Sequence, residues 1–243
     1  PWHLETDLGP LISASAEESI QSYIVQAREE GRLLKQLDAP TRGHFVAPAV
    51  IEVTSIADLE KEVFGPVLHI ARYEADDFEQ VLKDVKDTGY GLTFGLHTRI
   101  DDRVRSISEH LPVGNIYVNR NQVGAIVESQ PFGGEGLSGT GPKAGGPHYV
   151  KRFTALERVE TERHADATVG ADDVNAALDK FDQTQPYCLS KTLMPGPTGE
   201  KNELSLWPRG LLLCLGPTLD DARRQAGAAR SVGCSAFIIA PGH

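Results

Sequence analysis

Two short stretches of this sequence combine residue types that can bind a small molecule. The first is Glu62-Val63-Phe64-Gly65-Pro66. A carboxylate at a turn can accept two hydrogen bonds from a ribose diol, and an aromatic ring offers an apolar face to a flat heterocycle. Gly65 and Pro66 are typical turn residues, so they would point Glu62 and Phe64 the same way. Taken alone, the stretch fits equally well a surface glutamate and a core phenylalanine where a loop meets a strand.

The second stretch begins at Gly114-Asn115-Ile116-Tyr117-Val118-Asn119-Arg120 and ends at Gln130-Pro131-Phe132-Gly133-Gly134. Between these two strings, Gly124 and Ala125 have little bulk, so their backbone N–H groups can approach an anionic ligand closely. Phe132 would form one wall of an apolar pocket. The plain alternative is that the whole segment is a flexible loop.

The composition argues against several classes of protein. The 243 residues carry a formal net charge of −10, whereas a nucleic acid or an anionic membrane favours a basic surface. No apolar run reaches the ~20 residues needed to cross a bilayer, and no signal peptide is visible. The three cysteines are widely spaced, which fits a reducing compartment better than a disulfide framework. We therefore expect a cytoplasmic protein without a nucleic-acid partner or a membrane segment.

None of the three cysteines has the surroundings of a nucleophile. Cys214 lies in the apolar run 211–215 and Cys234 opens another apolar run, so both are expected in the core. Cys188 follows Pro186-Tyr187, and nothing around it would activate a thiol. The sequence contains no Cys-x-x-Cys pair and no Cys/His metal spacing. We therefore expect no catalytic residue and no metal site in this chain.

Alternating elements indicate an α/β protein. Residues 15–31 have helical periodicity, with Ser15 and Glu18 as a candidate capping box and Gly31 as a stop. Strands and amphipathic helices then alternate, which predicts a parallel α/β sheet with flanking helices. The extended segments are expected at 45–53, 67–73, 91–98 and 115–119, and the helices at 76–87 and 101–110.

The composition changes near His164. Residues 164–209 hold a short helical pattern at 172–181 and then many Pro, Gly, Ser and Thr residues, so we interpret them as a linker or an irregular surface segment. From Gly210 the pattern resumes as one βαβ unit, which is too small for the ~5 strands of a usual sheet. We therefore expect the start of a larger domain. The unit comprises a strand at 211–215, a helix at 219–232 and a strand at 235–240.

In their order and separation, the two stretches resemble the C-terminal half of NAD(P)-dependent aldehyde dehydrogenases. Thr6-Asp7-Leu8-Gly9-Pro10-Leu11-Ile12 is similar to the segment that follows the catalytic cysteine in that superfamily. The glycine-rich residues 133–147 and the later segment 195–210 look like the Δ1-pyrroline-5-carboxylate (glutamate semialdehyde) dehydrogenase module of bifunctional proline utilization A enzymes. The resemblance covers nearly the whole chain.

The resemblance implies a fold and a domain order. Residues 1–152 would be the C-terminal part of an aldehyde dehydrogenase catalytic domain, and 153–163 its oligomerisation strand, so a homo-oligomer is expected. Residues 164–209 would be a linker, and 210–243 the start of a second, Rossmann-like α/β domain. The family's cysteine nucleophile and nucleotide-binding core would then lie before Pro1, so we expect a fragment that is inactive alone.

The resemblance also implies roles for the residues named above. Glu62 would hold the nicotinamide ribose of NAD, and Phe64 would pack against it. The N–H groups of Gly124 and Ala125 would hold the substrate carboxylate, with Phe132 beside the aliphatic chain. An upstream cysteine thiolate would attack glutamate semialdehyde, hydride would pass to NAD, and water would hydrolyse the thioester to release glutamate. FAD would serve only the upstream proline dehydrogenase domain.

Two alternatives stay open at this point. The chain could belong to another aldehyde dehydrogenase that acts on a different aldehyde, or it could be a non-catalytic oligomerisation module. A cysteine nucleophile motif and a proline dehydrogenase domain upstream would decide between them. The sequence leaves open the oligomeric state and the choice between NAD and NADP.

Overall fold

The computed structural model describes residues 6–139, 141–154, 170–181 and 187–240. The chain divides into two units, one formed by Pro1–Gln122 with Gly134–Gly139 and the other by Val123–Gly133 with Thr140–His243. Neither unit is continuous in sequence, because residues 134–139 return to the first one.

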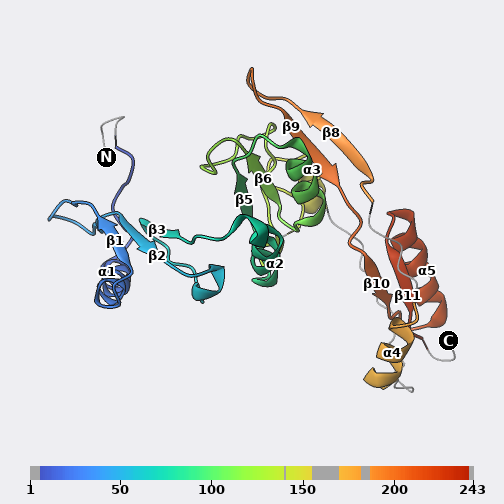
Figure 1. Ribbon diagram of the computed structural model, residues 1–243. Coiled ribbons are helices and arrows are strands. Elements are labelled where there is room, and N and C mark those ends of the chain that lie inside the picture. Colours follow the sequence, from blue (N-terminus) through green and yellow to red (C-terminus); the bar gives the residue numbers. More distant parts are fainter. Residues whose placement is uncertain (1–5, 140, 155–169, 182–186, 241–243) are drawn as a thin grey trace. The chain divides into compact units, whose positions relative to one another are not determined.

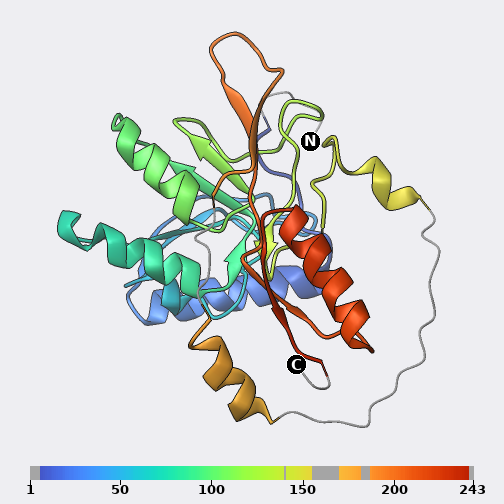
Figure 2. The same cartoon turned by 90° about the vertical axis from the view of Figure 1, so that its right-hand side faces the viewer.

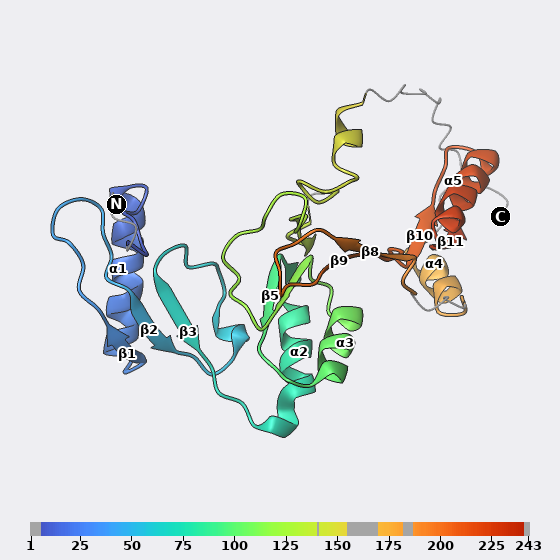
Figure 3. The ribbon, with the colours of Figure 1, turned by 90° about the horizontal axis from the view of Figure 1, so that it is seen from above.

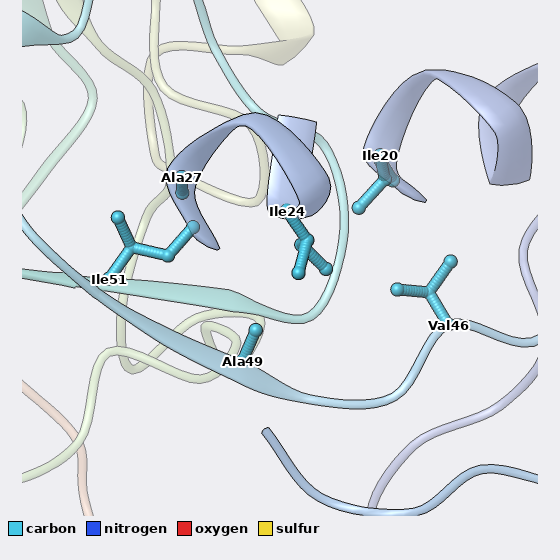
Figure 4. Close-up of a cluster of buried hydrophobic side chains, with 6 residues drawn as sticks. All are labelled: Ile20, Ile24, Ala27, Val46, Ala49 and Ile51. Atoms are coloured by element: carbon cyan, nitrogen blue, oxygen red, sulfur yellow. The ribbon is translucent and has the colours of Figure 1, made fainter. Parts of the chain in front are cut away.

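The first unit begins with one helix on a three-stranded sheet (Figure 1). The elements are α1 (Ala14–Glu29), β1 (Leu33–Gln36), β2 (Ala49–Glu52) and β3 (Val67–Ile70). β1 pairs with β2 antiparallel, whereas β2 pairs with β3 parallel. The buried side chains of the helix face those of the sheet and of the segment before β2 (Figure 4). The core between them consists of Ile20, Ile24, Ala27, Val46, Ala49 and Ile51.

The start of α1 differs from the predicted capping box. Ser13 caps the helix, because its Oγ accepts a hydrogen bond from the Ala16 N–H at 3.2 Å. Ser15 lies inside the helix, and its Oγ is 3.0 Å from the Ser13 Oγ. The predicted box of Ser15 and Glu18 is therefore wrong by two residues. Gly31 follows the helix with a φ of 74°, in the left-handed region that suits a glycine stop.

The rest of the first unit packs two helices beside a parallel pair of strands. The elements are η1 (Ile56–Asp58), η2 (Ala75–Asp77), α2 (Phe78–Asp87), β5 (Thr93–Leu96), α3 (Asp101–His110) and β6 (Asn115–Val118). β5 and β6 are parallel. The helices α2 and α3 lie side by side (Figures 1 and 3). Leu96, Ile107 and Leu111 are buried between these elements.

A tight pair of two-residue strands holds residues 134–139 in the first unit. β4 (Tyr90–Gly91) pairs antiparallel with β7 (Glu135–Gly136). Gly136 has a φ of 57°, and a side-chain carbon there would overlap the Gly89 carbonyl oxygen. The Gly91 N–H donates a hydrogen bond to the Ser138 Oγ at 3.3 Å. Glycine is therefore required at position 136 for both its backbone conformation and its lack of bulk.

The second unit contains a hairpin followed by a βαβ unit. Its elements are η3 (Val150–Phe153), α4 (Ala171–Leu178), β8 (Ser190–Met194), β9 (Asn202–Leu206), β10 (Leu211–Cys214), α5 (Leu219–Ser231) and β11 (Ser235–Ile238). β8 and β9 are antiparallel, and β10 and β11 are parallel. Figure 2 shows α5, in red, beside the two strands of its unit. Cys214 and Cys234 lie in the core with three alanines, as predicted.

The helices at 76–87, 101–110, 172–181 and 219–232 are confirmed within a few residues. The prediction of one parallel sheet is wrong in detail. β2 and β3 are parallel and β1 adds an antiparallel edge, so this three-stranded sheet is mixed, whereas β5 and β6 form a separate parallel pair. The sequence pattern carries the type of an element, but pairing depends on contacts between distant residues.

The prediction of an irregular segment at 164–209 is wrong for Ser190–Leu206, because these residues form the β8–β9 hairpin. Of the predicted oligomerisation strand at 153–163, Phe153 ends a 3-10 helix, and residues 155–163 lie outside the described residues. The domain boundaries at 152, 163 and 209 stay predictions. No helix in the described part of the chain is long and apolar enough to cross a bilayer.

Candidate functional site

The first loop, Glu62–Pro66, is a surface feature between η1 and β3. Glu62 is exposed and Phe64 is 82% exposed, which excludes the alternative of a core phenylalanine. Two successive tight turns shape it, since the Gly65 N–H donates to the Val63 oxygen at 3.0 Å and the Val67 N–H donates to the Gly65 oxygen at 2.8 Å. The loop therefore presents a carboxylate and an aromatic ring to solvent.

The base of the first loop is pressed against the core of the helix and sheet. A side-chain carbon at Gly65 would overlap the Cδ1 atom of Ile20, which is buried on α1. The Pro66 oxygen accepts a hydrogen bond from the Ala49 N–H at 3.0 Å. A larger residue at position 65 would therefore displace the buried Ile20 side chain, whereas the backbone of Gly65 lies outside the left-handed region and sets no demand for glycine. This contact fixes the loop whose tip carries Glu62 and Phe64.

A partly buried histidine lies just beyond the first loop. His69 on β3 makes a hydrogen bond of 2.8 Å between its Nε2 and the hydroxyl of Tyr23 on α1. Burial lowers the pKa of His69, and the positive charge of Arg32 lowers it further. The lowered pKa favours the neutral imidazole, which links β3 to α1 without adding a charge there.

The second loop, Val123–Gln130, carries the predicted anion-binding residues. Gly124 has a φ of 71°, and a side-chain carbon there would meet no atom within 4 Å. Ala125 is half-buried, whereas the neighbouring Val123, Ile126 and Val127 are exposed. A run of exposed aliphatic side chains on a loop is typical of a binding surface.

The buried amide of Gln130 closes the second loop. The Gln130 N–H donates to the Ile126 oxygen at 2.8 Å, and the Ile126 N–H donates to the Gln130 Oε1 at 3.3 Å. The Gln130 Nε2 donates to Glu200 Oε2 at 3.4 Å and to Asn202 Oδ1 at 3.3 Å. The sequence interpretation missed this role. A single amide side chain next to the Pro131-Phe132 pair was the available signal.

Phe132 is held by a two-way backbone bridge. Its N–H donates to the Ala144 oxygen at 3.0 Å, and the Ala144 N–H donates to the Phe132 oxygen at 2.8 Å. The Lys143 Nζ donates to the Gly133 oxygen at 2.8 Å. Phe132 is half-buried, so part of the residue stays accessible to solvent. This arrangement suits the wall of an apolar pocket.

The structure places the predicted residues in two groups. Glu62 and Phe64 share the first loop, in the first unit, whereas Gly124, Ala125 and Phe132 belong to the second unit. Among the described residues, no group of three or more His, Cys, Asp or Glu side chains could hold a metal ion. The arrangement offers binding groups for a diol, a flat ring and a small anion.

Comparison with known proteins identifies the family. The model of the aldehyde dehydrogenase family matches residues 1–159. The chain belongs to the aldehyde dehydrogenase family. Both loops and Phe132 lie within the matched residues, whereas all three cysteines lie beyond residue 159. The predicted resemblance is therefore confirmed.

Relatives of this aldehyde dehydrogenase chain include the bifunctional protein PutA of Klebsiella aerogenes. The two are 41% identical over 268 residues, which cover 96% of this chain and 20% of that protein. The chain thus spans about a fifth of the length of the curated relative. The match covers more than the family model does, so it includes much of the second unit beyond residue 159.

Two solved structures support the aldehyde dehydrogenase fold. A proline utilization A from Bradyrhizobium japonicum is 52% identical, has a TM-score of 0.58, and is matched over 61% of this chain and 15% of that chain. A Thermus 1-pyrroline-5-carboxylate dehydrogenase with bound NAD is 39% identical, has a TM-score of 0.54, and is matched over 60% and 29%. The predicted α/β fold with flanking helices is therefore confirmed, with mixed rather than purely parallel sheets.

Proposed function

We propose that this chain supplies binding elements to an NAD-dependent L-glutamate γ-semialdehyde (Δ1-pyrroline-5-carboxylate) dehydrogenase of proline catabolism. The observation that carries the proposal is the shape of the second loop, where a side-chain carbon at Gly124 would meet no atom within 4 Å and the next residue is the small, half-buried Ala125. Relatives named for proline utilization and for 1-pyrroline-5-carboxylate support the same substrate. The aldehyde of glutamate carries a carboxylate, which a second-loop N–H group can bind.

The second loop recognises the substrate carboxylate through backbone N–H groups. Gly124 and Ala125 add almost no side-chain volume, so an oxygen can approach their amides to hydrogen-bonding distance. Phe132 packs against the aliphatic carbons between the carboxylate and the aldehyde. An aldehyde without the carboxylate keeps the apolar contact and loses the hydrogen bonds.

The first loop suits the nicotinamide half of NAD. The exposed Glu62 carboxylate can accept hydrogen bonds from both hydroxyls of a ribose, and the exposed ring of Phe64 can pack beside the sugar or the nicotinamide. NAD, when bound, supplies the hydride acceptor of the reaction. The protein's part is to hold the ribose in one orientation, and the tight turns at Gly65 shape the loop directly after Glu62.

The nucleophile is proposed to lie outside this sequence. Cys214 and Cys234 are buried in the core of the βαβ unit, and Cys188 lies in the second unit beyond the family match. The aldehyde dehydrogenase chemistry therefore requires a cysteine from elsewhere in the enzyme, and this chain alone is expected to be inactive. The alternative of a non-catalytic module predicts that substitutions in either loop leave enzyme activity unchanged.

The bifunctional architecture is also part of the proposal. The family model ends at residue 159, yet the match to PutA covers 96% of the chain. This extent favours an enzyme that also carries an FAD-dependent proline dehydrogenase domain. A homo-oligomer located in the cytoplasm stays a prediction.

The proposal is tested by Ala125→Leu in the full-length enzyme. A bulky side chain should block the carboxylate, so KM for glutamate semialdehyde should rise by an amount worth at least about 1–3 kcal/mol. KM for a straight-chain aldehyde of similar length without a carboxylate should hardly change. Steady-state kinetics with both aldehydes measure the difference. Equal losses for the two would indicate a general packing defect and would remove the case for an amino-acid semialdehyde.

A further inference from the structure

Gln130 is unusual among the described residues because it is the one polar side chain in the buried class, with 7% of its surface exposed. A buried amide is costly unless its polar atoms have partners. Here the oxygen accepts from the Ile126 N–H, and the nitrogen donates to Glu200 and Asn202. The partners on the two sides belong to different segments, so the amide joins the second loop to the β8–β9 hairpin.

The hairpin end of this connection is itself fixed. The Asn202 Nδ2 donates to the Pro195 oxygen at 3.4 Å across the turn, while its Oδ1 accepts from Gln130. A side-chain carbon at Gly196 would overlap the Asn202 Nδ2, so glycine leaves room for this orientation. A continuous series of hydrogen bonds therefore runs from the Ile126 N–H through two amides to the hairpin turn.

We infer that Gln130 is a positioning residue for substrate recognition, and that Glu200 and Asn202 of the hairpin set its orientation. The bond to the Ile126 N–H fixes the peptide between Ala125 and Ile126, which adjoins the amide that is proposed to bind the carboxylate. The inference rests on the proposed function of the second loop. It extends the binding site to a hairpin that lies beyond the aldehyde dehydrogenase match.

The decisive variant is Gln130→Glu in the full-length enzyme. It preserves the shape of the side chain and an acceptor for the Ile126 N–H, but it removes both donations and places a carboxylate beside Glu200. KM for glutamate semialdehyde should rise on the order of tenfold, because like charges and a lost charge-assisted bond disturb a buried network. KM for the aldehyde without a carboxylate should change less than about twofold.

A charge exchange provides the rescue. Gln130→Glu combined with Glu200→Gln has the same net charge as the wild type and restores a donor opposite an acceptor at position 200, although not the donation to the Asn202 Oδ1. This pair should return KM to within about threefold of the wild type. The matched control is Glu203→Gln, which removes a carboxylate from the same hairpin that pairs with Lys191 and Lys201 instead of Gln130. It should leave both KM values unchanged.

Equal losses for the two aldehydes, or failure of the exchange to restore KM, would overturn the inference. If thermal melting shows that Gln130→Glu does not fold, Asn202→Ala removes one acceptor from the half-exposed hairpin and should give the same selective rise in KM, with a smaller size. The two proposals fail separately. If Ala125→Leu raises KM for glutamate semialdehyde alone, while Gln130→Glu and Asn202→Ala raise KM for both aldehydes equally, only the positioning role is rejected. If Ala125→Leu raises KM for both aldehydes equally, the substrate assignment is rejected.

Discussion

The two loops of the candidate site are held in place by opposite means. The first loop is fixed by close packing, since a side chain at Gly65 would displace the buried Ile20 side chain. The second loop is fixed by polar contacts, since the Gln130 amide bonds Ile126, Glu200 and Asn202. Packing contacts are insensitive to charge and fail when volume changes, whereas a polar network fails when a donor or an acceptor is lost.

The glycines of the two loops show the same contrast. Gly65 has an ordinary backbone conformation but lies against the buried Ile20 side chain, whereas a side-chain carbon at Gly124 would meet no atom within 4 Å but the backbone is left-handed at a φ of 71°. Alanine should therefore be unfavourable at both positions for different physical reasons. The effect of replacing a glycine in a binding loop therefore depends on two separate properties, the space around it and its φ.

The largest effect is expected for Glu62→Ala at the tip of the first loop. Loss of charge-assisted hydrogen bonds to the ribose should cost about 1.5–3 kcal/mol in the use of NAD. Kinetics in the full-length enzyme should show an increased KM for NAD or a lower turnover number, with little change in KM for the aldehyde. A variant that keeps both NAD parameters would remove Glu62 from the cofactor site.

Gly65→Ala should destabilise the first unit by about 1–3 kcal/mol, because the new methyl group overlaps the buried Ile20 Cδ1. Ile20→Val removes that atom, so the double variant should be more stable than the sum of the single effects predicts. Chemical denaturation measures each variant. Gly9→Ala is the control, since a side-chain carbon there meets nothing within 4 Å. If the stability effects of Gly65→Ala and Ile20→Val simply added in the double variant, the overlap with Ile20 Cδ1 would not be the cause of the destabilisation.

Gly124→Ala should cost about 1–2 kcal/mol, because an alanine resists the left-handed conformation. Asparagine tolerates that region better, so Gly124→Asn should be the more stable of the two variants, although it is larger. Unfolding midpoints of the two variants give the order. If Gly124→Asn were the less stable protein, side-chain size would matter more than φ, and the contrast with Gly65 would fail.

The smallest effect concerns pH and His69. Because its pKa is lowered in the folded state, the unfolded state binds the proton more readily. Its contribution to stability is fully present above about pH 6.5, the ordinary pKa, and is lost as the pH falls through the lower folded pKa. His69→Gln should flatten the loss of stability in this acidic range, as measured by denaturation at several pH values. If the free energy of unfolding fell equally steeply with pH in His69→Gln and in the wild type, His69 would not cause this loss of stability.

Several elements could be predicted because their signal is local. The amphipathic pattern of residues 101–110 predicted α3 with the bounds that the structure has, and the βαβ unit at the C-terminal end was recognised by the same means. The first residue of a helix was harder to predict where two nearby residues can both serve as its N-cap. Ser13 and Ser15 are both good caps, and only the backbone geometry shows that Ser13 starts the helix.

The hairpin and the Gln130 network could not be read from the sequence. β8 is almost entirely exposed, so it lacks the alternation of apolar and polar residues that reveals a strand. The hairpin is defined by bonds between its own strands and by the contact of Asn202 with a residue 72 positions earlier. The family resemblance predicted the residues of the candidate site, which are Glu62, Phe64, Gly124, Ala125 and Phe132. The contacts that hold the two loops in place are visible only in the structure.

The return of residues 134–139 to the first unit has a consequence for inheritance. Exchange of DNA with a related gene at any point between codons 92 and 134 would separate β4 from β7, and a breakpoint between codons 133 and 143 would separate Phe132 from Ala144. Each hybrid would combine partners that evolved apart. Residues 90 to 144 are therefore expected to pass between lineages as one block, and successful recombination should occur on either side of it.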